Sequence, residues 1–261
     1  MLDKSVFEKF DLLPMSYSKL NSFSNYPCQF IINKLYKVDT GTNPAMRVGH
    51  HVEEMLHLKL QKDEIADDEE LFIEIYKKKL KNEFEDYHDQ ENLKKYISYI
   101  PKMYKNCEQL FVQLGNYPLL SYQEKIETTI LGVPFIGYTD FIFDLDDALW
   151  VYDLKTKARM TQPSNSEYLQ QWLYRKALEE KYKKPVHTHL FIVTPTKYHS
   201  EELEFTDDKQ HIEMHNKIKG MASMLQKCNT IEEVALLYQP NLDSWEWNTQ
   251  NIPARKQIWG I

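Results

Sequence analysis

Two aspartates and a lysine lie within segments whose other residues are typical of β-strands. The segment 133–144 (VPFIGYTDFIFD) contains Asp140, and the segment 148–156 (ALWVYDLKT) contains Asp153 and Lys155. Burying such charges in a sheet is unfavourable unless an opposite charge compensates them. Carboxylate oxygens are the ligands that Mg²⁺ and Mn²⁺ prefer, and these ions keep several waters and can share a substrate phosphate. The pattern therefore predicts a divalent cation between two strands.

Lys155 supplies the second part of this chemistry. It follows Asp153 by two residues, so both side chains point to the same face of the strand. A bound metal polarises a phosphate and acidifies water. An ammonium group beside the attacking water can orient it or offset developing negative charge. The combination favours phosphodiester hydrolysis, although D-x-K alone also recurs by chance on structural strands.

Runs of β-branched and aromatic residues predict the strands that must bring the two aspartates together. The expected strands are 121–130, 133–144, 148–156, 187–194 and an edge strand at 201–206. The first three are separated by LG and LDD turn signals, so we expect them to form an antiparallel meander. A helix expected at 166–183 separates this meander from the fourth strand.

Apolar residues at three-to-four spacing predict the helices. They indicate an amphipathic helix at 45–61 and a charged helical lobe of about three helices at 62–114, in which Pro101 marks a break. Further helices are expected as short pieces within 16–36, broken at Pro27, and at 208–227 and 230–238, before an irregular tail. The order of elements predicts an α/β sandwich with a helical insertion, folded as one domain over residues 1–261.

Composition and charge exclude several classes of protein. The chain has 42% hydrophobic and 27% charged residues, and no apolar run approaches the roughly 20 residues that span a bilayer. The start, MLDKSVFEKFDLLP, has the features of neither a secretory signal nor a transit peptide. We therefore expect a cytoplasmic protein without membrane contact. A formal net charge of −7 argues against a protein that coats nucleic acid through bulk charge.

The order of three motifs resembles the PD-(D/E)xK nuclease superfamily, most closely its RecB-like and phage-type exonuclease branch. The motifs are G-x-x-D, then Y-D-L-K-T, then Q-x-x-x-Y, which here are 137-GYTD-140, 152-YDLKT-156 and 170-QQWLY-174. The resemblance extends from Gly49 to Tyr174. It implies a restriction-endonuclease-like core, a mixed sheet of about four to five strands flanked by helices. That core would comprise about 45–61 and 121–206, with a helical insertion and C-terminal helices.

The resemblance implies a Mg²⁺-dependent DNA nuclease, with Mn²⁺ as an alternative metal. In such an enzyme Asp140, Asp153 and the Leu154 carbonyl would bind the metal, and Lys155 would be catalytic. Gln170 and Tyr174 would help to hold the DNA strand; they share a helix face at i, i+4.

The third metal ligand departs from the RecB-like pattern. RecB-like members usually have a histidine four residues after a glycine on the first helix, whereas in 49-GHHVEEMLH-57 that position is Glu53. Phage-type exonucleases have a glutamate there, which favours Glu53 as the third ligand. His50, His51 and His57 remain alternatives.

Other residues could contact DNA. Gln171 competes with Gln170 for the DNA-facing position. The basic residues that could contact phosphates are Lys157, Arg159 and Lys19. Trp245, Trp247 and Trp259 could stack on unpaired bases or pack onto the domain.

The cysteines do not predict a metal centre. Cys28, Cys107 and Cys228 form no CxxC pair, so we expect reduced thiols and neither a disulfide framework nor a four-thiolate site. Some relatives bind an iron–sulfur cluster through one N-terminal and three C-terminal cysteines. In 26-YPCQF-30 the corresponding position is Tyr26, and no C-terminal trio exists. We expect no iron–sulfur cluster.

These observations predict an exonuclease acting in DNA recombination, repair or degradation. The resemblance suggests a phage or mobile-element enzyme, active in the host cytoplasm, with a recombination or single-strand-annealing protein as a potential partner. One alternative is a structure-specific endonuclease with the same site. Another is a non-catalytic DNA-binding subunit, although such subunits generally lose the lysine or an aspartate. Strand polarity and oligomeric state are not predicted.

Overall fold

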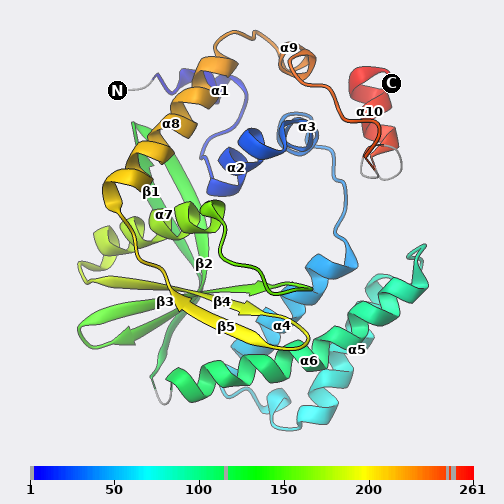
Figure 1. Ribbon diagram of the computed structural model, residues 1–261, viewed down its shortest axis with the longest axis vertical. Coiled ribbons are helices and arrows are strands. Elements are labelled where there is room, and N and C mark those ends of the chain that lie inside the picture. Colours follow the sequence, from blue (N-terminus) through cyan, green and yellow to red (C-terminus); the bar gives the residue numbers. More distant parts are fainter. Residues whose placement is uncertain (1–2, 115–116, 245–246, 248–250) are drawn as a thin grey trace.

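The computed structural model describes residues 3–114, 117–244, 247 and 251–261. Its centre is a five-stranded mixed sheet in the order β1-β2-β3-β4-β5 (Figure 1). The strands are β1 (Leu119–Ile130), β2 (Val133–Leu145), β3 (Ala148–Thr156), β4 (Val186–Val193) and β5 (Tyr198–Glu202). The first three pair as an antiparallel meander, β3 and β4 are parallel, and β5 returns antiparallel to β4. This is the restriction-endonuclease-like mixed sheet predicted from the sequence.

Helices cover both faces of the sheet. In Figure 1, α7 and α8 lie on one side of β3 and β4, and α4, α5 and α6 lie on the other. The helices are α1 (Ser5–Lys9), α2 (Tyr17–Asn25), α3 (Pro27–Phe30), α4 (Pro44–Leu60), α5 (Glu69–Glu83), α6 (Gln90–Leu114), α7 (Asn165–Tyr182), α8 (Asp207–Leu225), α9 (Ile231–Leu236) and α10 (Ile252–Trp259). A π-helical turn follows α3 at Ile31–Leu35, and a 3-10 turn precedes α5 at Glu64–Ala66. Within the described part of the chain, no helix is long and apolar enough to span a membrane.

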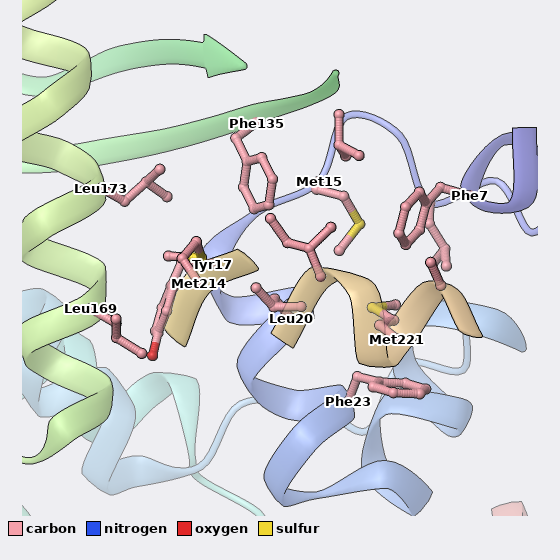
Figure 2. Packing of buried hydrophobic residues seen from close by; sticks show 14 of the residues in the cluster. Phe7, Met15, Tyr17, Leu20, Phe23, Phe135, Leu169, Leu173, Met214 and Met221 are labelled. Carbon is pink, nitrogen blue, oxygen red and sulfur yellow. The ribbon is translucent and has the colours of Figure 1, made fainter. Parts of the chain in front are cut away.

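Alternating side chains of the sheet belong to two separate hydrophobic cores. Leu149 and Val151 of β3 belong to the first core, between the sheet and α2, α7 and α8. Tyr152 and Leu154 belong to the second core, with α4, α5 and α6. Figure 2 shows part of the first core, where the labelled side chains are Phe7, Met15, Tyr17, Leu20, Phe23, Phe135, Leu169, Leu173, Met214 and Met221. Both faces of β3 are therefore buried, and any charge on it needs a specific partner.

The β1–β2 hairpin changes its orientation part-way along. Phe135 of β2 lies in the first core and Phe141 lies in the second, although they are six positions apart and would share a face in a regular strand. Between them, Gln123 of β1 has a left-handed backbone, with φ of +49°. The residue pairs on either side of Gln123 are regular: Tyr122 lies opposite Phe141, and Glu124 lies opposite Thr139. The irregular position is therefore the one shared by Gln123 and Asp140.

The helical lobe differs from its predicted form. It consists of two long helices, α5 and α6, where about three were expected. Pro101 lies inside α6 and does not end a helix. A proline removes one helical hydrogen bond, but the buried stripe of α6 continues on both sides of it, from Leu93 to Leu114. Packing of that stripe outweighs the local break.

The last strand also begins earlier than predicted. β5 starts at Tyr198 and ends at Glu202, whereas the sequence suggested 201–206. The backbone N–H of Thr194 donates to the Lys197 carbonyl at 2.9 Å, which closes a tight turn directly after β4. The sequence YHSEE is mostly polar and gives no clear strand pattern. The tight turn after β4 decides where β5 begins.

The C-terminal tail contains a helix, α10, where an irregular tail was predicted. Trp259 at its end donates from Nε1 to the carbonyls of Ala235 at 3.0 Å and Tyr238 at 2.9 Å. Trp247 is buried and packs edge-on against Trp259. These two tryptophans pack onto the protein, and Trp245 lies outside the described residues.

Close contact between α4 and the end of β3 depends on a glycine. Asn43 caps α4 by accepting a hydrogen bond from the N–H of Met46, and Pro44 occupies its first turn. One turn later, a Cβ added at Gly49 would lie 2.6 Å from Thr156 Oγ1. Only glycine allows the helix to approach the strand this closely.

We expect Gly49→Ala to destabilise the fold by about 1–3 kcal/mol, because the added methyl group overlaps the threonine hydroxyl. Thr156→Ala should restore most of this loss in the double variant. Gly220 lies in α8 with nothing within 4 Å of an added Cβ, so Gly220→Ala is the matched control and should be neutral or stabilising. Urea unfolding of the native chain, Gly49→Ala, the double variant and Gly220→Ala measures these differences. A Gly49→Ala chain as stable as the native chain would contradict the proposed steric constraint.

Candidate active site

Asp140 and Asp153 meet where β2 and β3 separate. The last regular pair of these strands is Phe141 with Tyr152, and the aspartates are the next residue on each strand. Beyond this pair, Asp140 Oδ2 accepts a hydrogen bond of 2.8 Å from the backbone N–H of Leu154. The Asp140 carboxylate thus takes the place of the backbone carbonyl that would accept this hydrogen bond in a regular sheet. The bond holds Asp140 beside Asp153.

Lys155 lies against the second aspartate. Its Nζ is 2.5 Å from Asp153 Oδ2 in an ion pair, and the Asp153 side chain is only 3% exposed. The contact lacks the alignment of a hydrogen bond, so this buried oxygen accepts none from the described residues. The Lys155 ammonium therefore neutralises this oxygen, which accepts no aligned hydrogen bond.

Burial and like charge act together on this cluster. Burial raises the pKa of Asp140 well above its ordinary value, and the carboxylates of Asp153 and Glu53 raise it further. Burial alone would lower the pKa of Lys155, but Asp153 and Asp140 outweigh it and raise that pKa. The lysine therefore stays protonated at neutral pH.

Glu53 approaches the pair from α4. Its Oε1 accepts a hydrogen bond of 3.1 Å from Gln123 Nε2, on the irregular position of β1. A cavity of about 250 Å³ lies beside this contact, lined by His50, Glu53, Glu54, Tyr122 and Gln123. Glu53 is close enough to Asp140 to raise its pKa.

Two of the three alternative histidines have aromatic partners of their own, and the third lies at the same cavity as Glu53. His51 is buried against Tyr76 and its Nε2 is 3.4 Å from Glu83, so it joins α4 to α5. The His57 ring stacks on Tyr122, with ring centroids 3.7 Å apart. His50 is exposed at the cavity. Among the candidates on α4, the geometry favours Glu53.

The helix behind the strands carries Gln170 and Tyr174. A capping box of Ser164 and Glu167 fixes the start of α7. Gln170 Nε2 donates to Tyr174 Oη at 2.8 Å. Burial raises the pKa of Tyr174; the charges of Asp153 and Asp140 raise it further, and that of Lys155 lowers it.

Gly137 of the first motif has a steric role. A Cβ at this position would lie 2.7 Å from Tyr174 Cε1. The glycine therefore allows the tyrosine ring to pack directly on β2. Gln171, the competitor of Gln170, is fully buried, and both of its amide atoms lack hydrogen bonds to the described residues. Gln170 is the one beside the site.

The structure does not bring the predicted basic residues to the carboxylates. Lys157 pairs with Glu167 at 2.8 Å and donates to Thr161 at 3.0 Å, which ties the end of β3 to the start of α7. Lys19 donates to backbone carbonyls of the N-terminal loop. Arg159 is exposed.

The donor set fits a hard divalent cation. Carboxylate oxygens of Asp140, Asp153 and Glu53 and the Leu154 carbonyl are ligands of the kind that Mg²⁺ and Mn²⁺ take. The buried Oδ2 of Asp153, which accepts no aligned hydrogen bond, is consistent with this use. Across the described residues, no three acidic, histidine or cysteine side chains converge closely enough to hold a metal. Instead, each carboxylate contacts a donor or cation of its own.

Comparison with known proteins identifies the family. A model of the PD-(D/E)XK nuclease superfamily matches residues 14–244, which include the strands, α4 and α7. This chain belongs to that superfamily. The nuclease has no match among curated proteins.

Solved structures share the fold of this nuclease. One is a candidate exonuclease from Eubacterium rectale, with 13% sequence identity, 88% of each chain covered and a TM-score of 0.57. Another is SSO0001, with 15% identity over 53% of this chain and 69% of that chain, and a TM-score of 0.34. At the identity of the first, the likeness shows a common fold.

Sequence patterns missed two residues of the site, Tyr122 and Gln123. The segment SYQEKIETTI is typical of a regular strand, in which neighbouring side chains point to opposite faces. Nothing in it indicates a left-handed residue, which is uncommon outside glycine and asparagine.

We expect Asp140→Asn to raise the melting temperature of the metal-free protein by a few degrees. The asparagine can still accept the Leu154 hydrogen bond, while the cost of burying a charge and the repulsion from Asp153 are both removed. Because the folded pKa of Asp140 is raised, its destabilising effect is absent below about pH 3.9, the pKa of an unfolded aspartate, and grows as the pH rises through the folded pKa. The gain should therefore be larger at pH 8 than at pH 5.

Asp144→Asn is the matched control on the same strand. Asp144 pairs with Lys184 at 2.7 Å, so its replacement should bring no gain at either pH. Calorimetric scans in EDTA measure both variants. If Asp140→Asn melted below the native protein at pH 8, the repulsion argument would fail.

Proposed function

We propose that this nuclease is a Mg²⁺-dependent deoxyribonuclease, with Mn²⁺ as an alternative metal, that acts as an exonuclease. The observation that carries the proposal is the cluster of Asp140, Asp153 and Lys155 at the point where β2 and β3 separate. Family membership supports phosphodiester hydrolysis by this cluster. Retention of both aspartates and the lysine argues against a non-catalytic subunit.

Glu53, Asp140, Asp153 and the Leu154 carbonyl would hold the metal. When bound, Mg²⁺ supplies charge that polarises the phosphate and acidifies a water molecule. The Leu154 N–H keeps the Asp140 carboxylate oriented. Without a cation, the three carboxylates repel one another, which accounts for their separate contacts with Leu154, Lys155 and Gln123.

Lys155 would act as a cation beside the phosphate. In the metal-free protein, Asp153 and Asp140 raise its pKa and keep the ammonium charged. A charged ammonium beside a phosphate orients the attacking water by hydrogen bonding and offsets negative charge as the phosphorus is attacked. Asp153 holds this ammonium in place at 2.5 Å.

Gln170 and Tyr174 would position the DNA strand. They form a hydrogen-bonded pair on α7, and Tyr174 is packed on Gly137 directly beside the cluster. Lys157 would contact a phosphate only after leaving Glu167, so we assign it a smaller role. The helical lobe of α5 and α6 would form one wall of the DNA channel.

The exonuclease assignment rests on similarity. The sequence motifs resemble the RecB-like and phage-type branch, and the Eubacterium rectale protein of similar fold is a candidate exonuclease. A role in DNA recombination, repair or degradation, in the cytoplasm and with a recombination partner, follows from the same resemblance.

The test is degradation of end-labelled linear and covalently closed circular DNA with Mg²⁺ or EDTA. We expect Mg²⁺-dependent loss of linear DNA alone. Lys155→Ala should reduce the rate at least about 100-fold, the effect of removing one charge-stabilising group in an active site. Lys184→Ala is the control, because Lys184 lies between α7 and β4 and pairs with Asp144 of β2, outside the cluster; its rate should match that of the native chain.

Each other outcome changes the assignment. Cleavage of circles would favour an endonuclease with the same site. Absence of Mg²⁺-dependent cleavage, or full activity of Lys155→Ala, would refute the assigned cluster.

A further inference from the structure

Two neighbouring residues of β1 both contact α4. Gln123 donates to Glu53 at 3.1 Å, and the Tyr122 ring stacks on His57 at 3.7 Å. Gln123 Nε2 also lies 3.2 Å from Tyr122 Oη, to which it donates. Glu53 and His57 are four residues apart and share a face of α4. Together these contacts form a two-point clamp between the strand and the helix.

A regular strand cannot form this clamp. Consecutive side chains of a strand point to opposite faces, so Tyr122 and Gln123 would point apart. Tyr122 lies on the α4 side of the sheet, and the left-handed backbone of Gln123, with φ of +49°, breaks the alternation and brings the Gln123 side chain to the same side. This conformation is unfavourable for a residue with a Cβ, and it occurs at the position that faces Asp140.

We propose that Gln123 is a positioning residue for Glu53. Its strained backbone turns the side-chain amide onto the Glu53 carboxylate and holds that carboxylate toward the metal site. The inference rests on the proposed function, because it gives Glu53 the role of a metal ligand. It adds Gln123 of β1 to the residues that orient the proposed metal ligands.

Gln123→Gly separates positioning from folding. Glycine adopts a left-handed backbone without strain, so the bend of the hairpin is kept while the amide is lost. We expect the dissociation constant for Mg²⁺ to rise roughly tenfold, as for other residues that orient metal ligands. The melting temperature in EDTA should equal or exceed that of the native chain. Isothermal titration with Mg²⁺ and calorimetric scans measure the two quantities without an activity assay.

Asp146→Gly is the matched control. Asp146 also has a left-handed backbone, with φ of +60°, but lies in the exposed turn between β2 and β3. Its replacement should leave the dissociation constant for Mg²⁺ unchanged. In a Glu53→Ala background, Gln123→Gly should have no further effect on that constant, because the amide acts through the carboxylate.

The outcomes separate this inference from the proposed function. If the native chain binds Mg²⁺ and Gln123→Gly binds it equally tightly, the inference is overturned and the proposed function stands. The same holds if Gln123→Gly weakens Mg²⁺ binding equally in the Glu53→Ala background. A native chain that binds no Mg²⁺ would overturn both.

Discussion

The repulsion between two carboxylates held on neighbouring strands is the constraint on which the site depends. Asp140 and Asp153 occupy facing positions where both faces of β3 are covered by hydrophobic cores. Such an arrangement is unstable unless each charge has a partner. The Leu154 N–H and the Lys155 ammonium are those partners. The same charges raise the pKa of the lysine and keep it protonated in the metal-free protein.

The surrounding elements are packed closely enough to maintain this arrangement. Two glycines remove the atoms that would otherwise separate the elements: Gly49 lets α4 approach the end of β3, and Gly137 lets Tyr174 pack on β2. The ion pair of Lys157 with Glu167 joins the strand end to the cap of α7. Lys157, which the sequence suggested as a phosphate contact, thus supports the fold, because its ion pair with Glu167 competes with a phosphate for the same ammonium.

The bend in the β1–β2 hairpin connects the site to the helical lobe. It lies at the shared position of Gln123 and Asp140 and lets one strand contribute to both hydrophobic cores. Local strain of this kind persists only where the surrounding structure compensates it. Here the stacking of His57 on Tyr122 and the packing of β2 in both cores provide that compensation.

The sequence by itself determined the fold class, the meander, the crossover helix and the family, because period-two and three-to-four patterns and the D-x-K motif are local properties of the chain. It also placed Lys155 with Asp153, since residues two apart share a strand face. Tertiary structure alone decided that Pro101 stays inside a helix and that β5 begins at Tyr198, because packing and turn closure outweigh local preferences. It likewise decided that Glu53 and none of the α4 histidines faces Asp140, and that Gln123 joins them. The Glu53–Gln123 contact links residues 70 positions apart, and no pattern in the sequence predicts the backbone angle of Gln123 that allows it.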